Sequence, residues 1–527
     1  MQSPRPSARA EHGMIATPHY LASKAGLEIL QEGGSAMDAI IAANAALTVI
    51  YPDQTSIGGD CFFLVYDPTD SSVLAWNGSG PAPAAASRQE LLNAGYNAMP
   101  RRGPYTVTVS GTIDAWFAGH DRFGKLDMDR LLKAAKAFAR DGFPVSPRLS
   151  NAIAAQAEIL PDLPYVGSVM LPNGRIPNPG DTLAFPNLAS SFDLIADSGR
   201  DAFYKGPIAD AIANHMRDID GWLTAADLEA YSGEWVDPLS IDYRGTTVYG
   251  FPPNSQGITS LIALGLLGFE TPDAEWGTSG DLHAQIEAKK RAFAVRDAEL
   301  GDPKFVDIDT EAMLSPSYLE ALWSDFDPQR IGMGQNDRVG DTVFLCAVDS
   351  DGLAVSMIQS MYQAFGSGVA DPETGIILHN RGSYFSLNEQ SPNVLEPGKR
   401  PLHTLMPSML VKNGELLGPI GTQGGDVQAQ VHIQQICDLI DYGIEPQQAI
   451  DLPRWISGGP NGPNEILLEQ GFTDDAIAGL ASRGHGITII ESWNGGAGHA
   501  QMIMRDPKTG ELLGGADPRA DGSAEGY

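Results

Sequence analysis

The spacing of hydrophobic positions predicts helices near the amino end of the chain. Residues 21–31 carry apolar side chains at helical intervals, and the pattern stops at Gly33-Gly34, where glycine can end a helix in the left-handed conformation. A second helix is predicted over residues 39–50, because Ser35 and Asp38 fit a capping box before this alanine-rich run. We therefore expect two successive helices joined by a short glycine turn.

Two predicted hairpins stand far apart in the chain. Residues 61–76 contain two strand-like runs around a turn at 67–70, and residues 342–360 contain two more around a turn at 350–352. Further helices are predicted over residues 128–140, 207–217, 282–298 and 427–442, and residues 486–515 are again rich in strand formers. This mixture of helices with long antiparallel pairings indicates an α+β protein.

Length and charge limit the possible classes of protein. The chain has 527 residues, more than a usual single domain, and 43% of them are hydrophobic, enough to bury a large core. Length alone leaves open several domains or one large layered unit. The 66 acidic residues outnumber the 34 basic ones, so the overall field repels nucleic acids and anionic lipid surfaces. We expect neither nucleic acid nor a membrane as a partner.

The amino terminus, cysteines and histidines narrow the class further. The start of the chain lacks the apolar stretch of a secretory signal, so the sequence predicts a cytoplasmic protein. The most apolar run, residues 36–50, is too short to span a bilayer. Cys61, Cys346 and Cys437 are widely separated, and none of the histidines pairs with another histidine or a cysteine at metal-ligand spacing. We expect reduced cysteines, no metal ion and no cofactor.

Common hydrolase motifs are missing from the sequence. H-E-x-x-H, C-x-x-C and G-x-S-x-G are absent, so zinc peptidase, redox and α/β-hydrolase chemistry have no support. Without an evident Ser-His or Cys-His arrangement, a base must come from elsewhere, and one source is a newly made amino terminus. An α-amino group has a reference pKa of about 7.7–8.0 and can accept a proton near neutral pH. A threonine at such a terminus combines nucleophile and base in one residue.

The segment from Gly340 to Ser360 resembles the processing site of the γ-glutamyltranspeptidases. In that family a threonine opens a strand that ends in Val-Asp, and a glycine turn and a second strand follow. Thr342, Val348-Asp349 and Gly352 reproduce this pattern. Other matching segments occur in the family's order at residues 13–17, 29–39, 56–63, 398–401, 421–425 and 515–519. Because these matches cover essentially the full length, coincidence is a poor explanation.

The resemblance implies a four-layer αββα sandwich of the N-terminal-nucleophile hydrolase type. It also implies one precursor that cuts itself between Asp341 and Thr342, so that residues 1–341 form a large subunit and residues 342–527 a small one within a single composite unit. The hydroxyl of Thr342 would attack the carbonyl of Asp341, and water would open the resulting ester. A homo-oligomer of such processed heterodimers is compatible with this organisation.

Three further residues complete the catalytic set that the resemblance implies. Ser360 stands where the family has a threonine that hydrogen-bonds the nucleophile, and serine keeps the hydroxyl. Gly424 and Gly425 match the family's diglycine, whose backbone N–H groups hold the oxyanion. Glycine permits the close approach of backbone and reacting carbonyl that this role requires.

The family's glutamate-binding residues are largely replaced in this chain. Asn77 aligns with the arginine that clamps the α-carboxylate, and asparagine cannot form the same bidentate pair. Tyr362 aligns with an asparagine, and Arg381 and Tyr384 align with the glutamine and aspartate around the α-amino group. The family's serine pair aligns with His403-Thr404. We expect these positions to line the substrate site.

These replacements change the expected substrate. The loss of an acidic ammonium binder at Tyr384 and the gain of Arg381 reverse the local charge preference from cation to anion. The pattern resembles the family branch of oxamate amidohydrolases and cephalosporin acylases. The sequence therefore predicts a self-cleaving amidohydrolase that acts on a small, acidic amide through an acyl-threonine intermediate.

Three alternatives to this prediction remain. The chain could be a glutathione hydrolase or γ-glutamyltranspeptidase of glutathione metabolism, or an unprocessed scaffold that binds a metabolite without turnover. The intact Thr342, Ser360 and diglycine argue against the scaffold. Arg381 could also pair with a neighbouring carboxylate and have no role in substrate binding.

Overall fold

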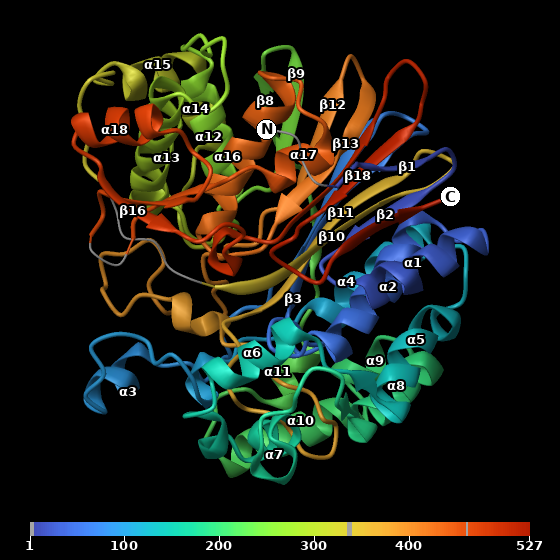
Figure 1. Ribbon diagram of the computed structural model, residues 1–527. Helices are drawn as coiled ribbons and strands as arrows, with labels where there is room; N and C mark the ends of the chain where they lie inside the picture. Colours follow the sequence, from blue (N-terminus) through green and yellow to red (C-terminus); the bar gives the residue numbers. More distant parts are fainter. Residues whose placement is uncertain (1–4, 335–339, 460–461) are drawn as a thin grey trace.

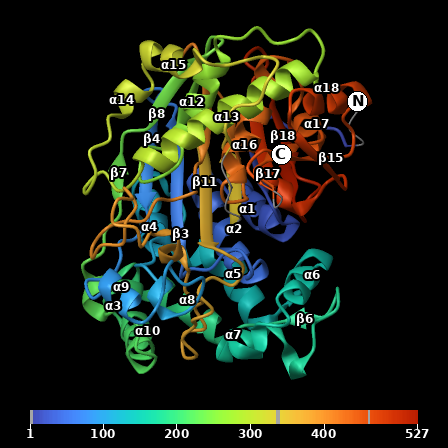
Figure 2. The same ribbon diagram turned by 90° about the vertical axis from the view of Figure 1, so that its left-hand side faces the viewer.

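The computed structural model describes residues 5–334, 340–459 and 462–527, and two seven-stranded antiparallel sheets form its centre (Figure 1). The first sheet has the order β1 (Ala8–Ala10), β18 (Leu512–Ala516), β17 (Ala500–Arg505), β13 (Glu415–Thr422), β12 (Ser408–Lys412), β9 (Thr246–Gly250) and β8 (Leu239–Tyr243). The second has the order β19 (Ser523–Gly526), β2 (Met14–Thr17), β10 (Asp341–Val348), β11 (Ala354–Tyr362), β3 (Asp60–Asp67), β4 (Ser72–Gly78) and β7 (Glu234–Val236). Figure 2 shows β4, β3 and β11 running side by side.

Two smaller sheets and a set of helices complete the described part of the chain. The smaller sheets are β14 (Trp455–Ser457), β15 (Glu465–Glu469) and β16 (Gly486–Ile490), and β5 (Phe143–Pro144) with β6 (Thr182–Leu183). The α-helices are α1 (Tyr20–Gln31), α2 (Ala36–Ile50), α3 (Arg88–Asn93), α4 (Thr112–Phe123), α5 (Met128–Asp141), α6 (Pro147–Ala155), α7 (Pro164–Met170), α8 (Pro186–Ser198), α9 (Asp201–Tyr204), α10 (Pro207–Asp218), α11 (Ala225–Glu229), α12 (Ile258–Leu267), α13 (Ser279–Glu299), α14 (Thr310–Met313), α15 (Pro316–Trp323), α16 (Val427–Ile440), α17 (Pro446–Asp451) and α18 (Asp474–Ser482). Short 3₁₀ turns are η1 (Pro104–Thr106), η2 (Leu160–Asp162), η3 (Pro172–Gly174), η4 (Arg381–Tyr384) and η5 (Gly495–Ala497).

Apolar side chains between the two sheets form one of the main cores. Alternate positions of a strand point to opposite faces, so Phe62 and Leu64 of β3 and Phe344 of β10 face the other sheet and pack with Met409 of β12. The ring of Phe62 stacks on that of Phe251, with the centroids 4.6 Å apart. The close packing of the two sheets holds the start of β10 in a fixed place.

Helices cover the outer face of each sheet. Phe63 and Val65 of β3 and Leu345 of β10 pack against the helical layer of α1, α2, α4 and α5. On the other sheet, Val248 and Leu410 pack against α12, α13 and α16. Figure 1 shows these two helical layers on opposite sides of the paired sheets. Helix α2 is buried along its whole length, because it lies between the sheet and other helices.

The predicted elements agree with the structure in type and differ at their ends. The hydroxyl of Ser35 accepts from the N–H of Asp38 at 3.1 Å and the Asp38 carboxylate accepts from the N–H of Ser35 at 3.0 Å, which confirms the capping box. Because this cap sets the first turn, α2 begins at Ala36, three residues before the predicted run. Both predicted hairpins are present as β3–β4 and β10–β11. The prediction of an α+β protein is confirmed.

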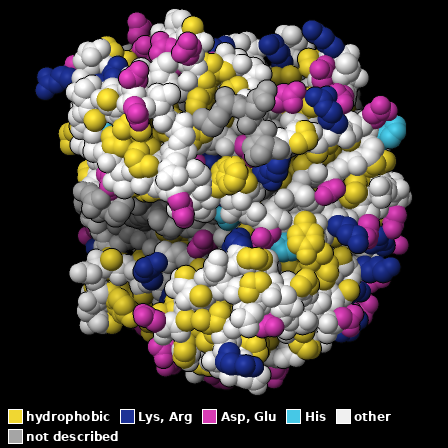
Figure 3. Space-filling view, viewed as in Figure 1, with side chains coloured by type: hydrophobic (Ala, Val, Ile, Leu, Met, Phe, Trp, Pro, Cys, Tyr) yellow, Lys and Arg dark blue, Asp and Glu magenta, His cyan; other side chains and the backbone are white. Residues whose placement is uncertain are grey.

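The surface charges, the cysteines and the helix lengths can be compared with what the sequence predicts. Figure 3 shows basic side chains lying beside acidic ones on the visible face. Cys61, Cys346 and Cys437 are all buried and unpaired, as predicted. Within the described ranges, no helix combines the length and the apolar character that crossing a membrane requires.

Candidate active site

Thr342 lies in a bulge at the start of β10. Asp341 pairs with Tyr362 of β11, and the next paired residue is Val343 opposite Gln359, so the register shifts between them. A bulge leaves one residue outside the regular ladder and turns its groups in a new direction. Here the extra residue is on β11, because Ser360 and Met361 both lie opposite Thr342 alone. Thr342 therefore has no directly paired residue in this ladder, and it is buried.

The hydroxyl of Ser360 connects the two groups that the sequence predicts to react. Thr342 Oγ1 donates to Ser360 Oγ at 3.1 Å, and Ser360 Oγ donates to the carbonyl oxygen of Asp341 at 2.6 Å. The N–H of Tyr362 donates to the same Ser360 oxygen at 2.7 Å. One hydroxyl can donate once and accept twice, so these three bonds use the full capacity of Ser360. The serine is therefore held in one orientation, facing the carbonyl of Asp341.

The predicted diglycine lies beside the segment that precedes Thr342. Gly424 and Gly425 follow β13 and have φ angles of 127° and 60°, a region that favours glycine. A Cβ atom added to Gly340 would lie 3.2 Å from the Cα atom of Gly425. Nε2 of Gln256 donates to the carbonyl oxygen of Gly425 at 3.1 Å and so orients this peptide group. The two backbones approach each other closely here because neither Gly340 nor Gly425 has a side chain.

Arg381 is a buried cation within the predicted substrate site. It opens the 3₁₀ turn η4, and its guanidinium carbon lies 4.0 Å from the ring centroid of Tyr362 and 5.4 Å from that of Tyr384. Nη2 donates to Oγ1 of Thr404 at 3.0 Å. Among the described residues, Nε and Nη1 have no hydrogen-bond partner, although the side chain is only 1% exposed. Burial lowers the pKa of this guanidinium.

The two tyrosines form the wall against which Arg381 lies. Their rings meet edge to face with the centroids 5.5 Å apart. A Cβ atom on Gly340 would lie 3.2 Å from the Tyr362 ring, so Tyr362 lies against both Arg381 and the segment before Thr342. The hydroxyl of Tyr384 donates to Asp426 at 3.0 Å, and Asp426 also pairs with Arg296 at 3.0 Å. Tyr384 is thus anchored on the loop that carries the diglycine.

His403 supports the neighbouring Thr404 through a buried carboxylate. Nε2 of His403 lies 2.9 Å from Oδ2 of Asp60, and Nδ1 of His379 lies 3.4 Å from the same oxygen. Burial lowers the pKa of His403 to about 3, so the ring is neutral and donates its Nε2–H to Asp60. Burial alone would raise the pKa of Asp60. His379 and His403 outweigh burial and hold this pKa well below its usual range.

The side chain of Asn77 forms hydrogen bonds with Ser79 and Asn254, which the sequence did not predict as site residues. Its amide oxygen accepts from the N–H of Ser79 at 3.0 Å and from the hydroxyl of Ser79 at 2.7 Å, and its amide nitrogen donates to Asn254 at 2.9 Å. Asn254 in turn accepts from the N–H of His403 at 2.7 Å. These contacts give Asn77 a role in supporting the His403-Thr404 segment, and its predicted contact with substrate stays a prediction.

The carboxyl group of Asp341 lies in an unusual electrostatic environment. Burial and the neighbouring carboxylate of Asp53 raise the pKa of Asp341 to about 6. The N–H of Ala364 and the guanidinium groups of Arg148 and Arg102 lower this pKa, but their effect is smaller. The residue before Thr342 therefore holds its proton more tightly than an ordinary aspartic acid does in the uncut chain.

Sequence reasoning missed the residues that support the site from distant segments. They are Asp53, Gln54, Asp60, Arg148, Gln256, Arg296 and Asp426. Asp60 lies in segment 56–63, which resembles the family's sequence, and this resemblance is the one signal that could have indicated a role for it. The others are single polar residues without a motif, and only the fold brings them to the site.

One grouping outside the site resembles a set of metal ligands. His283 and Glu287 of α13 and His485 offer ligand atoms that lie within 4.8 Å of one another. Burial lowers the pKa of His283 and lowers that of His485 to about 3, so both rings are neutral. The carboxylate of Glu287, however, already binds Lys290 and Arg291 at 2.9 Å each, and these cations disfavour a metal ion. The expectation of no metal stays a prediction.

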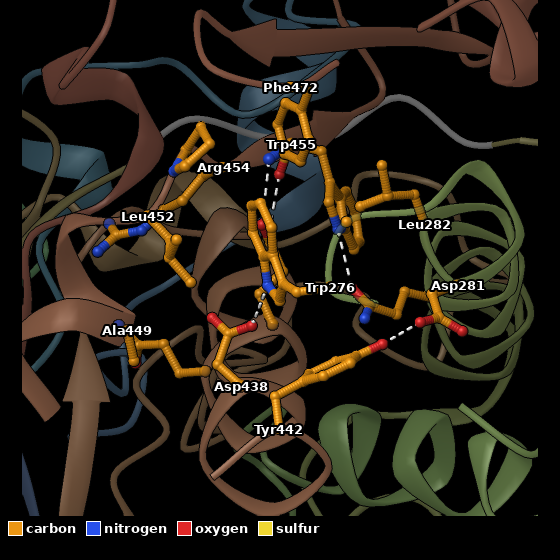
Figure 4. A pocket seen from close by; sticks show the side chains of 15 residues that line it. Trp276, Asp281, Leu282, Asp438, Tyr442, Ala449, Leu452, Arg454, Trp455 and Phe472 are labelled. Carbon is orange, nitrogen blue, oxygen red and sulfur yellow. Dashed lines mark hydrogen bonds between the residues drawn. The ribbon is translucent and has the colours of Figure 1, made fainter. Parts of the chain in front are cut away.

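A small cavity between α13 and α16 is too small for a substrate. Figure 4 shows Trp276 donating to Asp438 and Tyr442 donating to Asp281 along its wall. Its volume of about 20 Å³ leaves room for about one water molecule. Burial raises the pKa of Asp438 to about 7, although its bond from Trp276 acts in the opposite direction. The cavity contains none of the predicted site residues.

The comparisons with known proteins agree with this geometry. The sequence pattern of the family described as Gamma-glutamyltranspeptidase matches residues 22–527. The chain belongs to this family and is therefore an N-terminal-nucleophile hydrolase or transpeptidase that is made as a proenzyme. The resemblance found in the sequence is confirmed.

Three relatives describe the branch of the family. The chain is 41% identical to the glutathione hydrolase-like YwrD proenzyme of Bacillus subtilis, over 97% of this chain and 98% of that protein. It is 38% identical to the oxamate amidohydrolase proenzyme of Klebsiella pneumoniae, over 98% of each. The crystal structure of cephalosporin acylase from Bacillus halodurans superposes with a TM-score of 0.94 at 37% identity, covering 100% of this chain and 98% of that one.

Proposed function

We propose that the chain cuts itself between Asp341 and Thr342, and that Thr342 then hydrolyses the amide bond of a small substrate with an anionic group. The hydrogen-bonded series Thr342, Ser360 and the carbonyl of Asp341 supports the first part. The buried Arg381, with two donors that have no partner among the described residues, carries the second part.

In the first reaction, the oxygen of the Thr342 hydroxyl attacks the carbonyl carbon of Asp341. Ser360 donates to the carbonyl oxygen, which favours the charge that develops there, and the N–H groups of Gly424 and Gly425 are the further donors. The C–N bond then breaks, its nitrogen takes up a proton, and Asp341 remains as an ester on Thr342. Water opens the ester and leaves a free α-amino group on Thr342.

In the second reaction, this α-amino group serves as the base for its own hydroxyl. Its reference pKa of about 7.7–8.0 leaves a substantial unprotonated fraction near neutral pH. The Thr342 oxygen attacks the substrate amide, the amine or ammonia leaves with a proton, and an acyl-threonine remains. Water then attacks the ester, releases the acid and restores the hydroxyl.

The proposed substrate class follows from the surroundings of Arg381. No carboxylate in the described part of the chain pairs with this buried guanidinium, which therefore loses hydration and gains little in return. A bound carboxylate would restore both hydrogen bonds and charge balance, and the planar guanidinium fits it bidentately. Tyr362 and Tyr384 offer rings and no carboxylate for an ammonium group. An acid without an α-amino group therefore suits these groups better than glutamate does.

The arrangement of the sheets supports the proposed division into subunits. β11 and all of β10 except Asp341 belong to residues 342–527, and they lie between β2 and β3 of residues 1–341 within one sheet. Two chains interleaved in this way stay together after a cut, because separation would break the sheet on both sides. The order of helices, sheet, sheet and helices supports the four-layer αββα sandwich.

A denaturing gel and a substrate panel test this function. Residues 1–341 and 342–527, as shares of 56.0 kDa, correspond to bands of about 36 and 20 kDa. Thr342→Ala should leave one full-length band and no activity, because the attacking oxygen is gone. Cleavage at this bond in the mutant would show that another nucleophile acts. Assays of oxamate, glutaryl amides and glutathione then separate the proposed acid amidohydrolase from a glutathione hydrolase.

A further inference from the structure

The segment before β3 is held against the end of β11, where Ser360 and Tyr362 lie. The carbonyl oxygen of Gln54 accepts from the N–H of Met361 at 3.2 Å, and the carbonyl oxygen of Asp53 accepts from the N–H of Phe365 at 2.9 Å. These two bonds fix the backbone of Gln54 relative to β11. The side chain of Gln54 is 5% exposed and points toward the start of β10.

The side chain of Gln54 holds the carbonyl group of Thr342. Its Nε2 donates to the carbonyl oxygen of Thr342 at 2.6 Å, and its Oε1 accepts from Nη1 of Arg148 at 3.3 Å, in the amide orientation that satisfies both partners. In the reverse orientation, carbonyl would face carbonyl and N–H would face N–H. The hydrogen bond from Arg148 to the amide oxygen therefore orients the amide nitrogen of Gln54 toward Thr342.

Arg148 is itself firmly placed. Its Nη2 and Nη1 bind the carboxylate of Asp53 at 2.6 and 2.9 Å, and its guanidinium carbon lies 3.5 Å from the ring centroid of Tyr51. A bidentate pair with a carboxylate fixes the plane of the guanidinium. The orientation of the Gln54 amide is thus determined by residues that do not touch the reacting atoms.

This contact matters because of where Thr342 lies. The register shift leaves Thr342 without a paired residue in the ladder between β10 and β11, and its buried carbonyl accepts from the side chain of Gln54. When the bond to Asp341 breaks, Thr342 also loses its covalent connection on the amino side. Its carbonyl contact and its link to Val343 then determine how the α-amino group and Oγ1 lie relative to a substrate.

We propose that Gln54, oriented by Arg148, is a positioning residue that holds the Thr342 backbone in the reactive geometry during both self-cleavage and amide hydrolysis. The proposal rests on the proposed role of Thr342 as the nucleophile. Gln54 acts through Thr342 and has no part in recognising the substrate, which we place at Arg381. Its loss should therefore change rates more than substrate binding.

Two substitutions separate hydrogen bonding from space filling. Gln54→Met keeps the length of the side chain and removes both polar groups. Gln54→Glu keeps the shape and the contact with Arg148, but it places an acceptor against the Thr342 carbonyl. Gln435→Met is the matched control, because Gln435 is also a buried glutamine and lies on α16 outside the site.

The time course of self-cleavage is followed on denaturing gels for each purified precursor. Gln54→Met and Gln54→Glu should both slow cleavage at least about tenfold, as expected when the geometry of a catalytic group is loosened. Gln435→Met should cleave at the wild-type rate. After complete processing, kcat of the two Gln54 variants for an acidic amide should fall while KM stays within about twofold. Unfolding midpoints, measured in the Thr342→Ala background, check that the variants fold.

The outcomes distinguish this inference from the proposed function. If the wild type cleaves and Thr342→Ala does not, but Gln54→Glu cleaves as fast as the wild type, the positioning role is wrong and the nucleophile stands. The positioning role would also be wrong if the Gln54 variants had a raised KM and an unchanged kcat. If Thr342→Ala is itself cut at the same bond, the proposed function fails, and the inference fails with it.

Discussion

The hydroxyl of Thr342 donates to the hydroxyl of Ser360 at 3.1 Å across the start of the β10–β11 hairpin. Because Ser360 in turn donates to the carbonyl of Asp341, the proposed nucleophile and the carbonyl that we propose it attacks share one partner. This relationship makes Ser360 the residue whose removal tests the geometry most directly.

Ser360→Ala should slow self-cleavage about 100- to 1000-fold, the usual effect of losing one donor to a developing oxyanion. Ser360→Thr keeps the hydroxyl and should retain most of the rate. The measurement is the rate at which the full-length band disappears. Equal rates for the alanine variant and the wild type would mean that Ser360 only connects the two strands.

Arg381→Gln should raise the activation free energy that corresponds to kcat/KM for an acidic amide by about 2–5 kcal/mol, because a buried charge pair with the substrate is lost. A neutral analogue of the same substrate should lose far less, and self-cleavage should be unchanged. Arg9→Gln, at an exposed arginine, is the control. The deciding quantity is the ratio of kcat/KM for acid over neutral analogue. If that ratio does not move, Arg381 has a structural role.

Transfer to dipeptide acceptors should be weak, and hydrolysis should dominate. The reason is that the sequence predicts Asn77, Tyr362 and Tyr384 at the positions where the family's transpeptidases hold an amino-acid head group. Product partition with γ-glutamyl-p-nitroanilide and glycylglycine measures this directly. Strong acceleration by the acceptor would favour the glutathione hydrolase or transpeptidase alternative.

The uncut precursor should lose stability as the pH rises through the pKa of Asp341. Because this pKa is raised from 3.8 to about 6, the native state binds the proton more tightly than the unfolded chain does. The stabilising contribution is complete below about pH 4 and is lost above about pH 6, at most about 3 kcal/mol. Denaturant unfolding of Thr342→Ala, compared with Thr342→Ala/Asp341→Asn, isolates this contribution. Identical pH dependence of the two variants would contradict it.

The local elements of this protein could be predicted from sequence, because short-range interactions determine them. The capping box of Ser35 and Asp38 and the turn at residues 350–352 depend on neighbours within a few positions. Their ends were predicted less well, since α2 begins at its cap and β11 extends to Tyr362. The sequence segment around Thr342 also indicated the family, and the comparisons confirm it.

The tertiary structure alone decided which distant groups meet at Thr342. Gln54 lies 288 positions from Thr342 in the chain, and Asp60 lies 343 positions from His403. No periodicity connects such residues, because strand order and the packing of two sheets bring them together. The sequence by itself could place a cation at Arg381 but could not show that its partners are two tyrosine rings and a threonine hydroxyl. Whether a charge is paired depends on what the fold buries beside it, and that is decided only when the whole chain packs.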